Sequence, residues 1–398
     1  MSDSPTTGLE RWLDENWDED LTLLAWRQRL HGAGWLCPGW PARWGGRDAS
    51  AAEAAEVAAT LENRDVPGIP DGLGMRLAAP TLLAHASDTA AERFLVPTAT
   101  GQIGWCQLFS EPDAGSDLAS LTSRAERDRS SWVLNGQKVW TTSAHHADVG
   151  LLLARTSRGD DRHEGITCFV LPMRQPGVEV RPLRQMNGHA SFNEVFFRDA
   201  VIPADQVVGD VGDGWRVALT TLSHERRLGP LGAGLARRVG QGRARAEAAE
   251  EAARFAEPYR WYPQRAGRVD LLVPAARASE RATDPLVRQQ VAAVTALATA
   301  ARLSAQRAAA ARRAGRAPGP EGSLGKLASS VVARAAARAH SSIAGAAGML
   351  AGPDGPHDGV VAEVVVSVPA VSIAGGTDEI QHNIIGERVL GLPREPSR

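Results

Sequence analysis

The chain has 398 residues, 43% of them hydrophobic, so it is long enough for two or three domains with a large core. Its 44 basic and 46 acidic residues are mixed along the chain and give a formal net charge of -2, which argues against nucleic acid as a partner. The three cysteines are too few and too widely spaced for a disulfide framework or a thiolate metal site, and they favour a reduced, cytoplasmic setting.

The N-terminal segment MSDSPTTGLERWLDENWDED is acidic and lacks the basic region and apolar core of a signal peptide. No run of about 18 consecutive apolar residues is apparent in the sequence. We therefore expect a protein that is neither exported nor membrane-spanning.

The first hundred residues have a helical pattern. Apolar residues recur at spacings of three and four in LERWLDENW, LTLLAWRQRLHGAGW and AAEAAEVAATLENR. The intervening CPGWPARWGGRD is a loop whose tryptophans we expect to pack between helices. The pattern predicts an N-terminal helical domain over residues 1–103.

The pattern changes to β-type runs at about Trp105. SWVLNGQKVWTT is interpreted as two runs around Asn135-Gly136, because Asn-Gly is a strong signal for a tight hairpin. Further runs follow in GLLLARTS, ITCFVLPM, GVEVRPL and NEVFFRDAVI. They predict one antiparallel β domain over residues 104–207.

After GDVGDGW the helical period returns, in VALTTLSHERRLGPLGAGLARR and in long Ala/Arg-rich runs that permit close helix packing. These runs predict a helical bundle over residues 208–398, with RWYPQRAGRVDLLVPAARASERATDP as a loop or linker. The resulting class is α+β, because the order of helices, strands and helices lacks the alternation of a doubly wound fold.

Two apparent motifs do not support a site. GPLGAG, residues 229–234, has its glycines in the wrong order for a dinucleotide loop and lies inside a helical run. The His145-His146 pair has no partners at ligand spacing, so we expect a surface turn whose adjacent side chains diverge, and no metal.

Three other segments contain residues suited to ligand binding: SEPDAGSD from Ser110, KVWTTSA from Lys138 and GGTDEIQ from Gly375. The first is dense in hydroxyls, carboxylates and turn formers, and the second places an aromatic ring beside three hydroxyls. The third precedes an apolar, helix-like run, where backbone amides suit a phosphate. Taken alone, the first segment also fits a loop that leaves a strand, the second a core tryptophan and the third an ordinary helix start.

Together, in this order and at these separations, the segments resemble the acyl-CoA dehydrogenase family over about Trp35 to Pro396. The resemblance implies an N-terminal helical domain, a middle antiparallel β domain and a C-terminal four-helix-bundle domain. It further implies non-covalent FAD, an acyl-CoA or acyl-carrier thioester substrate and electron-transfer flavoprotein as electron acceptor. The implied assembly is a homodimer or homotetramer, with a heteromer left open.

Carried over position by position, the resemblance implies cofactor contacts at Phe109, Ser110, Ser116, Trp140, Thr142, Gly376, Thr377, Asp378 and Glu379. Phe109 and Ser110 match the strand end that meets the flavin ring. Ser116 also matches a contact to the acyl-CoA. Trp140 and Thr142 match the pair beside the flavin, and the other four match the loop that holds the FAD phosphate and ribose region.

The family reaction removes a proton α to a thioester while the β-hydrogen leaves as hydride, so a carboxylate must act as base. Many members carry it immediately before the Gly-Thr of the last segment, where this chain has Gly375. Isovaleryl- and long-chain-type members resemble this chain in carrying the base before an arginine on an earlier helix. The resemblance therefore implies Glu225 as the base, with Arg226 in the substrate site and the Gly375 amide as a donor to the thioester carbonyl.

Other interpretations stay open. One alternative to the catalytic role is that Glu225 is a surface residue paired with a nearby arginine, and another is that Asp378 or Glu379 replaces it as the base. The family's Arg-x-x-Phe-Gly element is poorly matched by Arg254-Phe255, and HSSIAGAAGML lacks the usual Gln and Gly-Gly pair. These departures allow a mainly structural subunit of a heteromeric dehydrogenase, or a flavin oxidase or monooxygenase on the same fold. The acyl chain is not specified by the sequence.

Overall fold

The computed structural model describes residues 5–225, 241–314 and 321–393. The chain divides into two compact units: Met1–Leu183 with Ala190–Tyr259, and Arg184–His189 with Arg260–Arg398. The predicted domain boundaries at residues 103 and 207 stay predictions.

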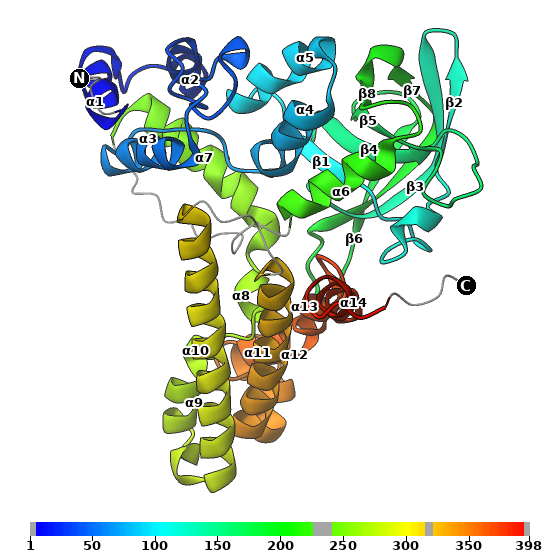
Figure 1. The fold of residues 1–398 in the computed structure, drawn as a ribbon. Coiled ribbons are helices and arrows are strands. Elements are labelled where there is room, and N and C mark those ends of the chain that lie inside the picture. The colour runs from blue at the N-terminus through cyan, green and yellow to red at the C-terminus, as the bar shows by residue number, and fades with distance from the viewer. Residues whose placement is uncertain (1–4, 226–240, 315–320, 394–398) are drawn as a thin grey trace. The chain divides into compact units, whose positions relative to one another are not determined.

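The first unit contains the N-terminal helices and the whole sheet (Figure 1). Its helices are α1 (Pro5–Asn16), α2 (Leu23–Gly32), α3 (Ala51–Asn63), α4 (Ala79–His85), α5 (Asp88–Ala99), α6 (Gly214–Glu225) and α7 (Arg243–Ala256). In the CPGWPARWGGRD loop, buried Trp44 packs with α4 and α5, and half-buried Trp40 packs against the same core cluster and against that of the first three helices. The expected packing of loop tryptophans between helices is confirmed.

An eight-stranded sheet forms the rest of this unit. Its strands are β1 (Trp105–Leu108), β2 (Arg124–Asp128), β3 (Ser131–Thr142), β4 (Val149–Arg155), β5 (Ile166–Pro172), β6 (Val178–Leu183), β7 (Phe192–Pro203) and β8 (Val207–Val208). Most neighbouring pairs are antiparallel, as predicted, but β1 pairs with β4 in parallel. The sheet is therefore mixed.

The sheet is buried on both faces at its centre. On β4, Leu151 and Leu153 belong to the core cluster that includes α4, α5 and α6, while Leu152 and Ala154 belong to the opposite cluster with β3 and β7. This division follows from the two-residue period of a strand. It explains why GLLLA reads as a continuous apolar run.

The predicted hairpin at Asn135-Gly136 is wrong, because both residues lie inside the continuous strand β3. The turn instead joins β2 to β3, where Asp128 pairs with Ser131. Gly136 has φ +146° at a register shift against β7, and a Cβ there would meet Ser123 Oγ at 2.4 Å. The glycine thus serves a bulge and a close approach.

The second unit is helical, with α8 (Tyr262–Arg265), α9 (Leu272–Ala278), α10 (Pro285–Arg313), α11 (Glu321–Ala344), α12 (Val360–Ser367), α13 (Pro369–Ile373) and α14 (Asp378–Arg388). Figure 1 shows α10 and α11 running side by side as its longest elements, and α9 packs with them around Leu272 and Ala339. The predicted linker before α10 was wrong, since it contains α8 and α9. Its prolines, Pro263, Pro274 and Pro285, lie in the first turns of α8, α9 and α10, where proline is tolerated.

One described segment, Val360–Arg388, has the length and hydropathy of a membrane-spanning helix, with 22% of its window buried. The chain is broken within it, because α13 ends at Ile373 and the loop before α14 contains Gly375 and Gly376 at φ +68° and +82°. It is therefore not one continuous helix, and its Val364 packs under α11. The absence of a membrane span stays a prediction.

Candidate functional site

The segment Phe109–Ser110 leaves β1 and is held by β3 through its backbone. Lys138 Nζ donates to the Phe109 carbonyl at 2.9 Å, and the Val139 amide donates to the Ser110 carbonyl at 2.9 Å. Phe109 is buried and Ser110 is half-buried. The predicted flavin-edge residues therefore lie on a fixed segment beside the strand that carries Trp140 and Thr142.

Under this segment lies a buried ion pair that the sequence analysis missed. Lys138 Nζ is 2.8 Å from Glu111 Oε1, and the two side chains are 0% and 5% exposed. Glu111 also accepts hydrogen bonds from the Thr122 amide and hydroxyl and from the Ser123 amide. With its lone pairs occupied, the carboxylate can remain ionised inside the protein.

The two pKa values reflect this burial. Burial raises the pKa of Glu111, but the Lys138 charge and the hydrogen bonds outweigh that effect and lower the pKa to about 2. Burial lowers the pKa of Lys138 to about 8, against the opposing influence of Glu111. The sequence signal for this pair is only that Glu111 and Lys138 each lie within one of the motifs, 27 residues apart.

The turn after Glu111 carries Ser116. Glu111 and Ala114 exchange backbone hydrogen bonds of 3.0 and 3.1 Å, which closes the turn, and Ser116 lies exposed beyond it. An exposed hydroxyl on a closed turn is suitable for contact with a ligand. Its predicted role toward FAD and acyl-CoA stays a prediction.

Trp140 has an unusual conformation. Its φ is +61°, which is rare for a bulky residue, and it lies at a register shift between Lys138 and Thr141. The bulge leaves the indole 56% exposed, edge-on to Phe192 with ring centroids 5.8 Å apart. Such backbone strain costs about 1–3 kcal/mol and concentrates at functional sites. An exposed indole beside half-buried Thr142 fits the predicted cover for a flat heterocycle.

Glu225 is the last described residue of α6. Gln107 Nε2 of β1 donates to Glu225 Oε2 at 3.5 Å, and Gln107 lies two residues before Phe109. The structure thus brings Glu225 beside the strand that leads into the predicted flavin-edge segment, although 118 residues separate the contacting pair. No pattern in the sequence points to Gln107.

The packing of α6 on the sheet fixes this placement. Gly214 lies against the β5 backbone, where a Cβ would meet the Thr167 carbonyl carbon at 2.6 Å. Farther along, Thr221 Oγ1 lies 3.0 Å from Thr81 Oγ1, and both side chains are fully buried. The predicted substrate contact Arg226 and the GPLGAG segment lie outside the described residues.

The GGTDEIQ segment belongs to the second unit. Thr377 is the N-cap of α14 and accepts from the Ile380 amide at 3.3 Å, as the sequence predicts for a helix start. Gln381 Nε2 donates to the Gly375 and Gly376 carbonyls at 3.1 and 3.4 Å. Among the described residues, the amides of Gly375 and Gly376 have no backbone acceptor.

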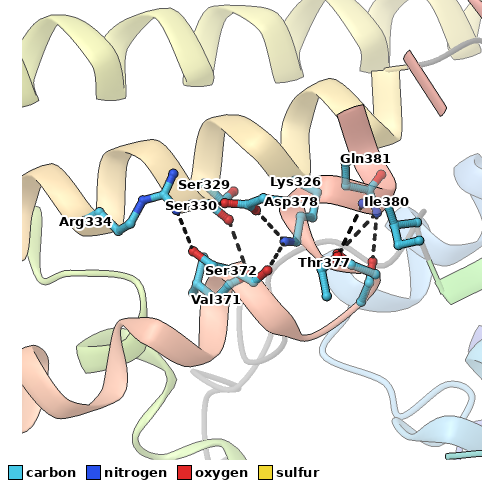
Figure 2. A network of polar contacts seen from close by, with 12 residues as sticks. Lys326, Ser329, Ser330, Arg334, Val371, Ser372, Thr377, Asp378, Ile380 and Gln381 are labelled. Atoms are coloured by element: carbon cyan, nitrogen blue, oxygen red, sulfur yellow. Dashed lines mark hydrogen bonds and ion pairs between the residues drawn. The ribbon is translucent and has the colours of Figure 1, made fainter. Parts of the chain in front are cut away.

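The two carboxylates of this segment differ. Asp378 is buried and pairs with Lys326 at 2.7 Å and Arg334 at 2.9 Å (Figure 2). Glu379, in contrast, is exposed. Burial would raise the pKa of Asp378, but hydrogen bonds from Lys326 and Ser330 and the two positive charges lower it. A carboxylate so paired is a poor base near neutral pH. The predicted cofactor contacts of both residues stay predictions.

The His145-His146 pair lies in an exposed turn, as predicted, but its rings do not diverge, since their centroids are 4.0 Å apart. Across the described residues no group of three or more His, Cys, Asp or Glu side chains is placed to hold a metal ion.

The residues present fit a flavin in two respects. The first unit places the exposed indole and Thr142 on β3, and the Val139 amide of the same strand holds the Phe109–Ser110 segment that follows β1. In the second unit, a Cβ at Gly375 would meet no atom of the described residues within 4 Å, so there is open space beside the loop on that side. Amides at a helix N-terminus carry partial positive charge and suit a phosphate.

Three family models match the chain: acyl-CoA dehydrogenase N-terminal domain over residues 9–102, middle domain over 106–200 and C-terminal domain over 265–390. The chain is 39% identical to acyl-CoA dehydrogenase IpdE1 of Mycobacterium tuberculosis over 384 residues, which cover 93% of this chain and 88% of that protein. It belongs to the acyl-CoA dehydrogenase family, whose members are FAD-dependent oxidoreductases. The predicted family and fold class are confirmed.

Solved structures agree on the fold. The Tcur3481-Tcur3483 steroid ACAD superimposes with a TM-score of 0.68 at 23% identity, covering 98% of this chain and 97% of that one. The ChsE4-ChsE5 complex from Mycobacterium tuberculosis gives a TM-score of 0.65 at 25% identity, covering 94% and 90%. Both names join two different proteins.

Proposed function

We propose that this chain catalyses α,β-dehydrogenation of an acyl-CoA or acyl-carrier thioester to the 2-enoyl thioester, with Glu225 as the base. The observation that carries the proposal is the contact between Glu225 and Gln107, two residues before the predicted flavin edge. Gly375 also supports it, because this position, which carries the carboxylate in many family members, has no side chain here. FAD, when bound, supplies the acceptor for the hydride.

The other roles in the proposed reaction are assigned to residues of this chain. Glu225 takes the proton from the carbon α to the thioester, and the Gly375 amide donates to the thioester carbonyl oxygen, where negative charge develops. Phe109, Trp140 and Thr142 orient the flavin and exclude water from it. Gly376 and Thr377 hold its phosphate region by backbone amides.

The proposed activity is tested by flavin bleaching. We expect the purified FAD-bound protein to be yellow and to lose its flavin absorbance anaerobically with at least one member of a panel of straight, branched and ring-bearing acyl-CoA thioesters. We further expect slow reoxidation by oxygen and fast reoxidation by an electron-transfer flavoprotein. Bleaching by none of the panel, or rapid reoxidation by oxygen, would favour the oxidase or monooxygenase alternative.

We also propose that the active assembly is a heteromer with a second chain of the same fold. The ChsE4-ChsE5 complex supports this, as do the departures at Arg254-Phe255 and in HSSIAGAAGML, where family members reach the FAD of a neighbouring subunit. The large apolar side chains of Val389, Leu390 and Leu392, which follow α14 closely in sequence, are 47% to 67% exposed. Such a cluster is typical of a surface that another chain covers.

Co-expression tests the assembly. We expect the chain expressed alone to purify with little FAD, and co-expression with a homologous acyl-CoA dehydrogenase chain to give a complex of both chains that retains FAD. Native mass spectrometry gives the composition, and the flavin-to-protein absorbance ratio gives the occupancy. A fully FAD-loaded homotetramer from the single chain would contradict this proposal but leave the dehydrogenase proposal intact.

A further inference from the structure

One face of α11 is built around the GGTDEIQ loop. Lys326, Ser330 and Arg334 are spaced four residues apart, so they lie on the same side of the helix. Figure 2 shows all three directed toward the end of α13 and the start of α14. This regular spacing is the sequence signal that could have revealed the network.

Each of the two cations bridges both ends of the loop. Lys326 Nζ donates to the Ser372 carbonyl at 3.1 Å and to Asp378 Oδ1 at 2.7 Å. Arg334 Nη1 donates to Ser372 Oγ at 3.0 Å and to Asp378 Oδ2 at 2.9 Å. Ser330 Oγ adds a hydrogen bond to the Val371 carbonyl at 3.3 Å. The residues before and after the loop are thereby anchored to a single helix.

Asp378 is the centre of this clamp, which consists of Lys326, Arg334, Ser372 and Asp378. Its side chain is 7% exposed, and each carboxylate oxygen accepts from a different cation. A carboxylate held by two cations is anionic, and both of its oxygens are occupied by the clamp. Its part is therefore positional.

The loop between the anchors has little freedom. Gly375 and Gly376 both have positive φ, and Gln381 holds their carbonyls. The Gly376 and Thr377 amides share peptide planes with these carbonyls and are fixed with them. The preceding plane, which carries the Gly375 amide, lies between the held Gly375 carbonyl and the Ala374 amide, which donates to the Ala370 carbonyl at 3.0 Å. A change in the position of Asp378 would move these donors.

We propose that Asp378 is a positioning residue for the proposed dehydrogenation. The clamp fixes the span of the loop and so aims the Gly375 amide at the thioester carbonyl. This inference rests on the proposed function, because that function gives the amide its task. Misplacing a preorganised donor by about 1 Å is sufficient to cost about 10²-fold in rate.

The test compares Asp378→Asn with Asp284→Asn. Asp284 is a matched control because it also pairs with an arginine, Arg281 at 2.7 Å, and accepts from the Leu286 amide near the start of α10. We expect Asp378→Asn to lower kcat about 10- to 100-fold while KM changes less than about 3-fold. We expect Asp284→Asn to keep the wild-type kcat.

Two further readouts do not depend on turnover. Hydrogen exchange of the peptide covering residues 373–379 is expected to accelerate in Asp378→Asn only. The carbonyl stretch of a bound, unreactive acyl-CoA analogue is expected to shift toward the free value. Lys326→Met, which leaves Arg334 in place, is expected to show both effects at smaller size and covers the case in which Asp378→Asn does not fold.

Wild-type exchange rates and carbonyl stretch in both Asp378→Asn and Lys326→Met would overturn the inference, as would an equal loss of kcat in Asp284→Asn. A wild-type protein that no thioester bleaches would instead contradict the proposed function. Even in that case, unchanged hydrogen exchange in Asp378→Asn and Lys326→Met would contradict the positioning role of the clamp.

Discussion

Replacing Glu225 with glutamine is expected to keep the fold and bound FAD but to slow flavin reduction by the thioester about 10²- to 10⁴-fold. The amide has nearly the same size as the carboxylate and still reaches Gln107, but it cannot accept the α-proton. Anaerobic stopped-flow absorbance measures the rate of flavin reduction. Unchanged bleaching would assign the base elsewhere.

A relocation experiment is the control for this variant. Adding Gly375→Glu to Glu225→Gln places a carboxylate where many family members have it. A Cβ at Gly375 would meet no atom within 4 Å in the part of the chain that the structure describes, but φ there is +68°, so the added residue costs about 1–2 kcal/mol. We expect partial recovery of flavin reduction. A third variant, Glu225→Asp, keeps the charge but shortens the side chain. If the double variant recovers flavin reduction and Glu225→Asp does not, the reach of the base limits the reaction as well as its charge.

Replacing Lys138 with methionine is expected to lower the free energy of unfolding by about 3–5 kcal/mol, because it leaves the Glu111 carboxylate buried without its cation. The variant also removes the donor to the Phe109 carbonyl, so we expect weaker FAD binding. Denaturant unfolding followed by tryptophan fluorescence measures the first effect, and FAD titration measures the second.

The double variant Lys138→Met with Glu111→Gln separates charge from packing. We expect it to recover part of the stability lost by Lys138→Met, since no uncompensated charge remains buried. If the loss of stability in the double variant equalled the sum of the losses in the two single variants, the two residues would not be coupled, and this account would be contradicted.

The same pair sets an acid limit on stability. The pKa of Glu111 falls from an ordinary 4.5 to about 2 in the folded protein, so the carboxylate's contribution is present above 4.5. This contribution is lost as pH falls through about 2, because the unfolded chain takes up the proton first. The difference between the two pKa values corresponds to about 3 kcal/mol of stability. We expect the pH dependence of unfolding below 4.5 to be shallower by up to one proton in the double variant. An identical slope would contradict the assignment.

Several features followed from the sequence. Helical and two-residue periodicities predicted the order of helices, strands and helices, because burying one face imposes a period on each element. The GGTDEIQ segment predicted a loop that enters a helix, and Thr377 is the N-cap of α14, since capping is a local property. The three motifs gave the family, which the comparisons confirmed.

Other features depend on contacts that local patterns do not record. Asn135-Gly136 has the composition of a hairpin turn, yet pairing of Asn135 with Arg124 and of Gly136 with Phe197 holds it inside β3. The linker before α10 has three prolines and one glycine, but packing of Leu272 stabilises α9 there. In both cases tertiary pairing outweighed local propensity.

By itself the sequence determined the family, the residue types at the motifs and the missing side chain at Gly375. Only the tertiary structure placed Glu225 beside Gln107, buried Glu111 with Lys138, turned Trp140 outward and fixed Asp378 between Lys326 and Arg334. Each of these depends on residues that are distant in sequence or on a register shift between strands. Charge and exposure at such positions are set by which neighbours the fold supplies, and no short-range pattern encodes those neighbours.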